Sequence, residues 1–175
     1  LVDGGPDFSQ RTEPEQETVS DTKRVYLAWN QLVTNNNLSA EERYACRLDV
    51  FSLLPKVDWA EFRTLSGTYE QPDAGFFGIM SWLAEQDSYS DSEILWIQMG
   101  CTVPGLDGAY TDAYCHVLSQ ALFFDPVAFA RTLAADGVDS EVLYQAIRFA
   151  AYDAQMDPAR LEDAVEVLNT ALEDG

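Results

Sequence analysis

Four aspartates recur at a nearly fixed interval along the chain. Asp58, Asp91, Asp125 and Asp157 lie 33, 34 and 32 residues apart, and four residues after each comes a large apolar side chain: Phe62, Leu95, Phe129 and Leu161. A fixed period in this range is typical of stacked helical hairpins, because a single hairpin can bury its apolar face only against its neighbours. The interval therefore favours a repeat of two-helix units over a compact helical bundle with chance spacing.

Signals for helix N-termini accompany this interval. Ser39 and Glu42 form a capping box, in which each side chain accepts a hydrogen bond from a free backbone amide. Asp125 and Asp157 each precede a proline, which suits the first helical position because its missing N–H would have no partner there. We therefore expect all four aspartates to be N-caps, with a structural role, although Ser90 is also a candidate cap beside Asp91. With apolar residues at i, i+3, i+4 and i+7, these signals predict nine helices, at residues 20–35, 39–54, 58–67, 73–86, 91–101, 107–124, 126–136, 140–153 and 158–173.

The predicted fold class is all-α. Residues 20–175 are expected to form one helical-repeat domain of four hairpins plus a leading helix, because sustained alternation of apolar and polar residues, the mark of a half-buried strand, is absent. Residues 1–19 hold Gly4-Gly5-Pro6 and Glu13-Pro14 among mostly polar residues, a composition typical of an irregular arm or a linker.

The hairpin from Asp107 to Phe129 carries a family resemblance. Its segments Asp107-Gly108-Ala109-Tyr110-Thr111-Asp112-Ala113-Tyr114 and Ala121-Leu122-Phe123-Phe124-Asp125-Pro126-Val127-Ala128-Phe129 are similar to HEAT/armadillo-type repeats of uncharacterised secreted or lipoprotein-like proteins from Gram-positive anaerobic bacteria. The similarity covers residues 38–175. It implies a right-handed α-α superhelix and an extracellular or cell-envelope location, with a cytoplasmic location as the alternative, and it transfers no catalytic residue. Tetratricopeptide repeats share the period but require a first-helix consensus that this chain lacks.

The charge of the chain limits its partners. The 30 acidic and 10 basic residues give a formal net charge of −20, and the stretch between Arg63 and Arg131 holds no Lys or Arg, which predicts a continuous negative field there. Nucleic acids and anionic lipids are bound by neutralising phosphates, so this surface disfavours both. A basic protein or peptide is the expected partner. Direct membrane insertion is not expected, because the chain has no apolar run of about 20 residues.

Motifs for catalysis, metals and cofactors are missing. The three cysteines have irregular spacing and form no C-x-x-C, so we expect buried free thiols. His116, the single histidine, lies one turn from Asp112, a carboxylate that could orient its imidazole. A nucleophile would still be needed, and the sequence neighbours Ser119 and Cys115 need not face the same atom, so we expect an exposed or groove-edge histidine. The oxygen-rich segment 87–93 lacks the glycine and glutamate of a calcium loop and is explained by helix capping. We predict no catalytic residue, no metal and no cofactor.

A binding role is the leading functional hypothesis. The second helices of the predicted hairpins, at 58–67, 91–101, 126–136 and 158–173, would line the concave surface that such stacks use for binding. Trp59 is of interest because burial is often partial at the first position of a helix. The candidate binding residues are Trp59, Trp96, Glu93, Gln98 and Arg131. The chain is therefore predicted to be a non-enzymatic scaffold for proteins or peptides; the alternatives are a cell-envelope hydrolase with a carboxylate pair and a spacer without a ligand.

Overall fold

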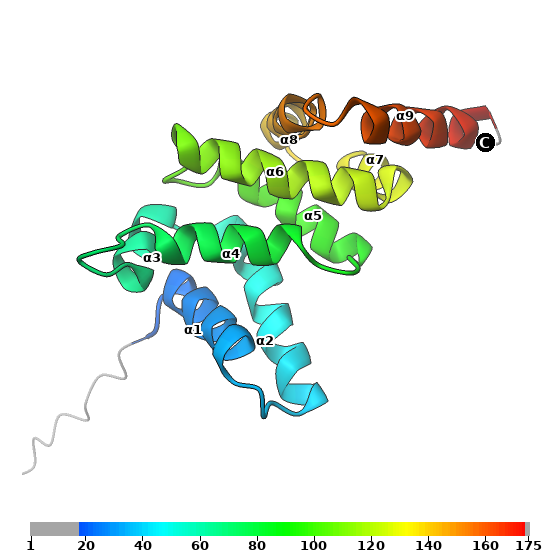
Figure 1. Cartoon of the computed structure of the whole chain (residues 1–175). Helices are drawn as coiled ribbons and strands as arrows, with labels where there is room; N and C mark the ends of the chain where they lie inside the picture. Colours follow the sequence, from blue (N-terminus) through cyan, green and yellow to red (C-terminus); the bar gives the residue numbers. More distant parts are fainter. Residues whose placement is uncertain (1–17, 174–175) are drawn as a thin grey trace, which may run out of the picture.

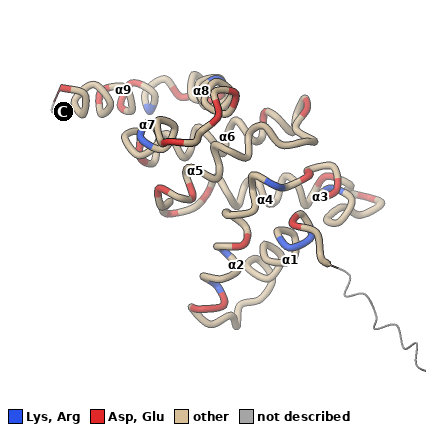
Figure 2. The backbone as a smooth tube through the Cα atoms, turned by 180° about the vertical axis from the view of Figure 1, so that it is seen from behind, with Lys and Arg blue, Asp and Glu red and all other residues tan. Residues whose placement is uncertain are grey.

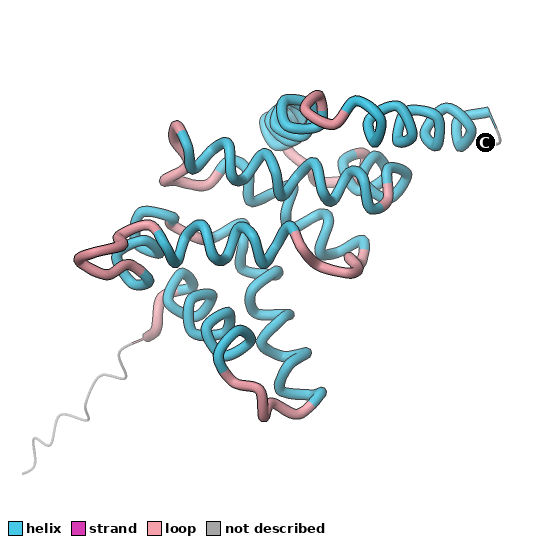
Figure 3. Tube along the Cα trace, in the orientation of Figure 1, coloured by secondary structure: helices cyan, strands magenta, loops and turns pink. Residues whose placement is uncertain are grey.

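The computed structural model describes residues 18–173, and every regular element in that range is a helix (Figure 3). The predicted all-α class is confirmed, and so is the number of α-helices, nine within the described residues. The elements are α1 (Asp21–Thr34), α2 (Ala40–Leu53), η1 (Leu54–Lys56), α3 (Trp59–Ser66), α4 (Ala74–Ala84), α5 (Asp91–Met99), η2 (Gly100–Thr102), α6 (Ala109–Phe124), α7 (Pro126–Leu133), α8 (Ser140–Ala154) and α9 (Pro158–Glu173), where η marks a short 3-10 helix. Most of the predicted arm, residues 1–17, lies outside the described residues.

The helices pack in two rows. One row runs α1, α3, α4, α6 and α8, and the other runs α2, α5, α7 and α9, with neighbours in each row in contact. Figure 1 shows the stack rising from α1 and α2 to α8 and α9. The hairpins are therefore α1–α2, α4–α5, α6–α7 and α8–α9, each with one helix in either row.

The position of α3 corrects the predicted hairpins. The interval from Asp58 to Asp91 predicted that α3 and α5 are equivalent, but α3 packs on α1 and α4, and it is α2 that packs on α5. The cause is the Pro55-containing turn η1, which ends α2 and sends the chain across to the other row. There the Asp58 amide donates to Thr22 Oγ1 of α1 at 3.0 Å. The helix α3 is therefore an insertion between the first two hairpins.

Three of the four aspartates cap helices as predicted. Asp58, Asp125 and Asp157 accept hydrogen bonds from backbone amides in the first turns of α3, α7 and α9. Of the two candidate caps at α5, Ser90 is confirmed and Asp91 is wrong. Ser90 caps α5 in a capping box with Glu93, and Asp91 is the first helical residue, because serine reaches the Glu93 amide from the position before it.

An aromatic cluster lies where α3 meets α4 and α6. The Trp59 ring centroid lies 5.3 Å from that of Phe62 and 5.4 Å from that of Phe76, both edge-to-face, and 6.3 Å from that of Tyr114. All four side chains are buried. Edge-to-face pairs at these distances add to the free energy that burial contributes. This cluster holds the inserted helix in the stack.

The loop between η2 and α6 packs against the N-terminus of α3. The Trp59 amide donates to the Pro104 carbonyl at 3.1 Å, and Arg63 Nη1 donates to the Gly105 carbonyl at 2.9 Å. Gly105 has a φ of +87°, and a Cβ added there would lie 2.6 Å from the Ala60 amide nitrogen. Both the backbone angle and the close approach therefore require glycine at this position.

Candidate binding site

Two of the predicted binding residues belong to the core. Trp59 is fully buried, although it is the first residue of α3, because the loop at Pro104 and Gly105 covers it. Gln98 is also fully buried; its Nε2 donates to the Phe129 carbonyl and its Oε1 accepts from Thr132 Oγ1, both at 2.9 Å. The prediction of a ligand contact was therefore wrong for both, and Gln98 instead ties α5 to α7.

Glu93 and Trp96 line a polar pocket of about 510 Å³ between α2 and α5. Its centre is Arg47 of α2, whose Nε donates to Glu93 Oε1 at 2.5 Å and whose Nη2 donates to the Ser88 carbonyl at 2.7 Å. Arg47 Nη1 donates to Gln86 Oε1. The guanidinium thus bonds Gln86 and Ser88 of the loop before α5 as well as Glu93 of α5, and each of its three nitrogens has a partner within the protein. This arrangement clamps the loop onto α2.

The environment of Glu93 keeps it ionised. Burial favours the neutral form, but hydrogen bonds from Arg47 and from the Ser90 amide outweigh it, so the pKa of Glu93 is lowered. A glutamate held as an anion does not serve as a general acid near neutral pH. The Arg47–Glu93 pair therefore supports a structural clamp and gives no support to the hydrolase alternative.

The variant Arg47→Met is expected to lower the free energy of unfolding by about 2 kcal/mol at neutral pH, since it leaves a mostly buried carboxylate without its cation. Because the pKa of Glu93 is lowered in the folded state, its contribution is complete above the ordinary glutamate value of about 4.3 and is lost as pH falls through the folded-state pKa. The difference in the free energy of unfolding between Arg47→Met and wild type should therefore become smaller in acid.

Urea denaturation from about pH 7 to about pH 3 measures this difference. Arg131→Met is the matched control, because the Arg131–Asp91 pair, at 2.7 Å, leaves both side chains more than half exposed. Exposed pairs contribute little, so the control should unfold as wild type does. A pH-independent effect of Arg47→Met would contradict the assigned role of Glu93.

Arg131 lies at the surface of α7, as its prediction as a binding residue requires, but its Nη2 is bonded to Asp91. Arg131 and Arg47 thus bring positive charge to two acidic side chains of the stretch that lacks Lys and Arg in sequence. The negative field expected there is interrupted at α5. Arg131 does not join the polar pocket, which is lined from α2, from α5 and from the loop before α5.

His116 pairs with Asp153 of α8 and does not pair with Asp112. His116 Nδ1 lies 3.0 Å from Asp153 Oδ2, and the Ser119 hydroxyl donates to the same oxygen at 2.5 Å. The carboxylate thus stands between serine and imidazole, whereas nucleophilic catalysis needs the imidazole to bond the hydroxyl. Ser119 is also fully buried. These three residues join α6 to α8 and do not form a catalytic triad.

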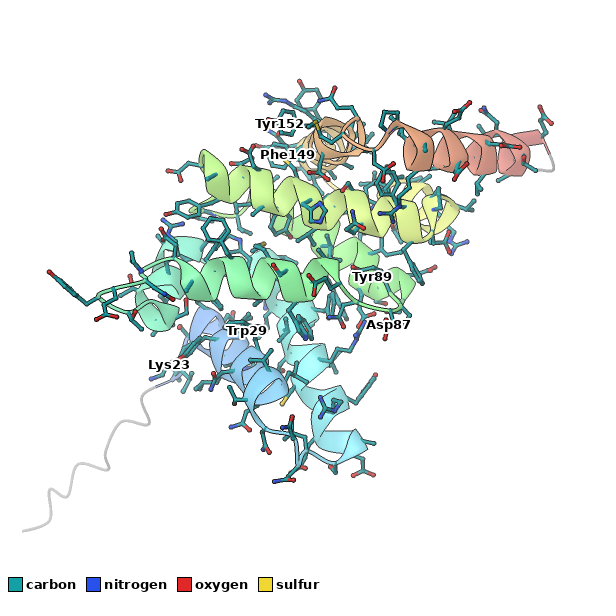
Figure 4. The ribbon with its side chains drawn as sticks, in the orientation of Figure 1. Lys23, Trp29, Asp87, Tyr89, Phe149 and Tyr152 are labelled. Carbon is teal, nitrogen blue, oxygen red and sulfur yellow. The ribbon has the colours of Figure 1, made fainter. Side chains whose placement is uncertain are left out.

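The segment 87–93 is organised by helix capping and by a buried tyrosine. Figure 4 shows Asp87 and Tyr89 on the loop before α5. The Tyr89 hydroxyl donates to the Leu83 carbonyl at 2.6 Å, and burial raises the pKa of Tyr89 to about 12. Within residues 18–173, no group of three or more His, Cys, Asp and Glu side chains is placed to hold a metal ion.

The cysteines are free thiols in differing environments. Cys101 and Cys115 are buried as predicted, and burial raises their pKa to about 12 and about 11, respectively. Cys46 is only partly buried, which corrects the prediction for that residue. Thiols with raised pKa values are poor nucleophiles because little thiolate is present.

An apolar groove of about 450 Å³ opens between α7, α8 and α9, and sequence analysis did not predict it. Leu143 and Ile147 of α8 remain 39% and 51% exposed beside it. The apolar groove is lined by Leu122, Pro126, Phe129, Ala130, Leu133, Ala134, Leu143, Ile147, Ala150, Ala151, Leu161 and Leu168. The helical spacing of these residues on α8 and α9 was visible in the sequence, but it predicted faces closed against neighbours. In the structure α8 and α9 make few contacts with each other.

The exposed surface of α9 beside the apolar groove is acidic. On α9, Glu162, Asp163, Glu166 and Glu173 are exposed, and Arg160 is the only Lys or Arg of that helix (Figure 2). The Arg160 guanidinium lies 4.3 Å from the centroid of the Phe123 ring, and its Nη1 donates to Gln120 at 3.0 Å. The positive charge is thus held against α6, so α9 presents mainly carboxylates to solvent.

The described helices define an all-α protein with an open apolar groove at one end. Comparison of the chain with protein families, with curated proteins and with solved structures finds no match. None of the described helices combines the length and apolarity needed to cross a membrane.

Proposed function

We propose that this chain is a non-enzymatic binding domain that holds a protein or peptide in the apolar groove between α7, α8 and α9. The exposure of Leu143 and Ile147 beside a groove of about 450 Å³ carries this proposal. Contiguous exposed apolar surface with a polar rim is a mark of interaction sites. The acidic surface of α9 favours a basic partner.

The repeat class is part of the same proposal. Hairpins with one helix in each of two rows support a HEAT/armadillo-like stack, and in such stacks the exposed surface serves for binding. The secreted or cell-envelope location implied by the resemblance remains a prediction. The hydrolase alternative needs a carboxylate of raised pKa in a cleft, and Glu93 in the polar pocket has a lowered pKa.

Affinity capture from the native cell envelope tests the proposal. Wild-type protein should retain a partner that Leu143→Ser/Ile147→Ser loses, and higher salt should weaken capture because charges contribute to it. The matched control is Leu27→Ser/Val33→Ser, which alters two α1 side chains of similar exposure, 47% and 46%, away from the groove. Equal capture by both double variants would overturn the proposal.

A further inference from the structure

We infer that the apolar groove binds one amphipathic α-helix of a partner protein, and that this helix carries a row of Lys or Arg beside its apolar stripe. The inference rests on the proposed function and specifies the partner of the same site. Three observations carry it: the spacing of the groove walls, the small residues between them, and the charge of the α9 edge.

The walls of the groove have helical spacing. Leu143 and Ile147 lie one turn apart on α8, while Leu161 and Leu168 lie two turns apart on α9. A helix offers side chains at i, i+3 or i+4, and i+7, which fit between rows of this spacing. An extended peptide that binds by strand addition needs a sheet edge, and the described part of the chain has no strand. A polyproline segment docks in aromatic-lined grooves, whereas this groove is lined mainly by aliphatic side chains.

Small residues line the groove between the large ones. Ala130 of α7, Ala134 directly after α7, and Ala150 and Ala151 of α8 leave the volume that apolar side chains of a partner would fill. A cavity of about 450 Å³ holds a few aliphatic side chains but not a whole helix with its backbone. The bound helix therefore lies along the groove and inserts one stripe, and its other face stays in solvent.

The α9 edge sets the charge of that helix. Glu162, Glu166 and Glu173 each follow an apolar residue of the α9 stripe, namely Leu161, Val165 and Leu172. Because residues three, four and seven apart share one face of a helix, these carboxylates form a row next to the stripe. The row lies on the exposed side of α9 beside the groove, so a basic flank on the bound helix would complement it. A second copy of this chain fits poorly, because its net charge is −20.

A labelled peptide tests the inference with the whole chain. The probe is a fluorescein-tagged peptide of about 16 residues of Leu, Lys and Ala, with leucines at i, i+3, i+4 and i+7. Fluorescence anisotropy measures its Kd, and circular dichroism measures helix formation on binding. We expect binding with a gain of helix, about tenfold or more weakening by Leu143→Ser/Ile147→Ser, and no change with Leu27→Ser/Val33→Ser.

The charge requirement is tested separately. Glu162→Gln/Glu166→Gln should weaken peptide binding about threefold to fivefold at about 0.1 M salt and reduce its salt dependence. Glu41→Gln/Glu70→Gln removes the same charge from exposed positions on α2 and on the loop before α4, and it should leave the Kd unchanged. Equal effects of the two variants would show that net charge alone attracts the peptide, which would overturn the basic-flank inference.

Two further peptides separate this inference from the proposed function. A scrambled peptide of the same composition should bind at least about tenfold more weakly; equal binding would overturn the inference. The second peptide contains proline and cannot form a helix. If it binds and Leu143→Ser/Ile147→Ser abolishes that binding, the proposed binding function is supported and the inferred helical partner is wrong. If no peptide responds to those substitutions, both fail. A dimer in sedimentation equilibrium that the same substitutions dissociate would assign the groove to a second copy and overturn the inference.

Discussion

Replacing Trp59 by alanine is expected to lower the free energy of unfolding by about 3–5 kcal/mol, the cost of removing a large aromatic side chain from a closed core. Trp59 is fully buried and packs edge-to-face on Phe62 and Phe76. Its loss would open a cavity at the point where α3 joins the stack. Urea denaturation followed by circular dichroism measures the effect.

Two other substitutions make this prediction specific. Trp96→Ala should cost clearly less, because Trp96 is only partly buried at the edge of the polar pocket. Trp59→Phe should also cost less than Trp59→Ala, since it keeps most of the apolar volume and removes the Nε1 donor, which has no hydrogen-bond partner. The phenylalanine variant provides a transition to measure if the alanine variant does not fold. Equal costs for Trp59→Ala and Trp96→Ala would contradict the core assignment.

The second large effect is expected from Gly105→Ala, which should destabilise the protein by about 3 kcal/mol. Alanine disfavours a φ of +87°, at a cost of about 1 kcal/mol or more. The added Cβ would also lie 2.6 Å from the Ala60 nitrogen and 3.0 Å from the Trp59 Cβ. Displacing the loop would then weaken the hydrogen bonds at Trp59 and Arg63, and overpacking of this kind costs about 1–3 kcal/mol.

Gly137→Ala separates the cost of the positive φ from the cost of the close contact with α3. Gly137 has a φ of +90°, nearly that of Gly105, but no atom lies within 4 Å of an added Cβ. Gly137→Ala should therefore lower the free energy of unfolding only by the cost of placing alanine at a positive φ, about 1 kcal/mol. The two variants should therefore differ in their free energy of unfolding, measured by heat or urea, by the cost of the close contact at α3. If Gly137→Ala costs as much as Gly105→Ala, the close contact contributes nothing.

The sequence was sufficient for local structure because the signals for helix ends are local. Ser39, Asp125 and Asp157 cap helices at the predicted positions, since capping needs only the residues of the first turn. The wrong cap, Asp91, differs by one residue from the true one, because Ser90 and Asp91 are both good caps and their competition depends on exact geometry.

Arrangement in space could not be predicted in the same way. The interval from Asp58 to Asp91 resembles the later intervals, but Pro55 and the Thr22 contact place α3 in the other row. Trp59 was expected to be partly exposed, and a loop more than forty residues later covers it. The apolar groove was missed for a related reason, because spacing along α8 and α9 shows which faces are apolar but not how far apart the two helices lie.

The weak packing of α9 has a thermodynamic consequence. Ala164 is its one buried residue within the described range, and Val165 and Leu172 remain 47% and 79% exposed. In a stack whose units contact only their neighbours, such an end opens at lower free energy than the centre. A helix seated between α8 and α9 would bind the closed hairpin and not the open one. Occupancy would then raise the stability of the hairpin by mass action, and the affinity for the partner would include the free energy of closing that hairpin.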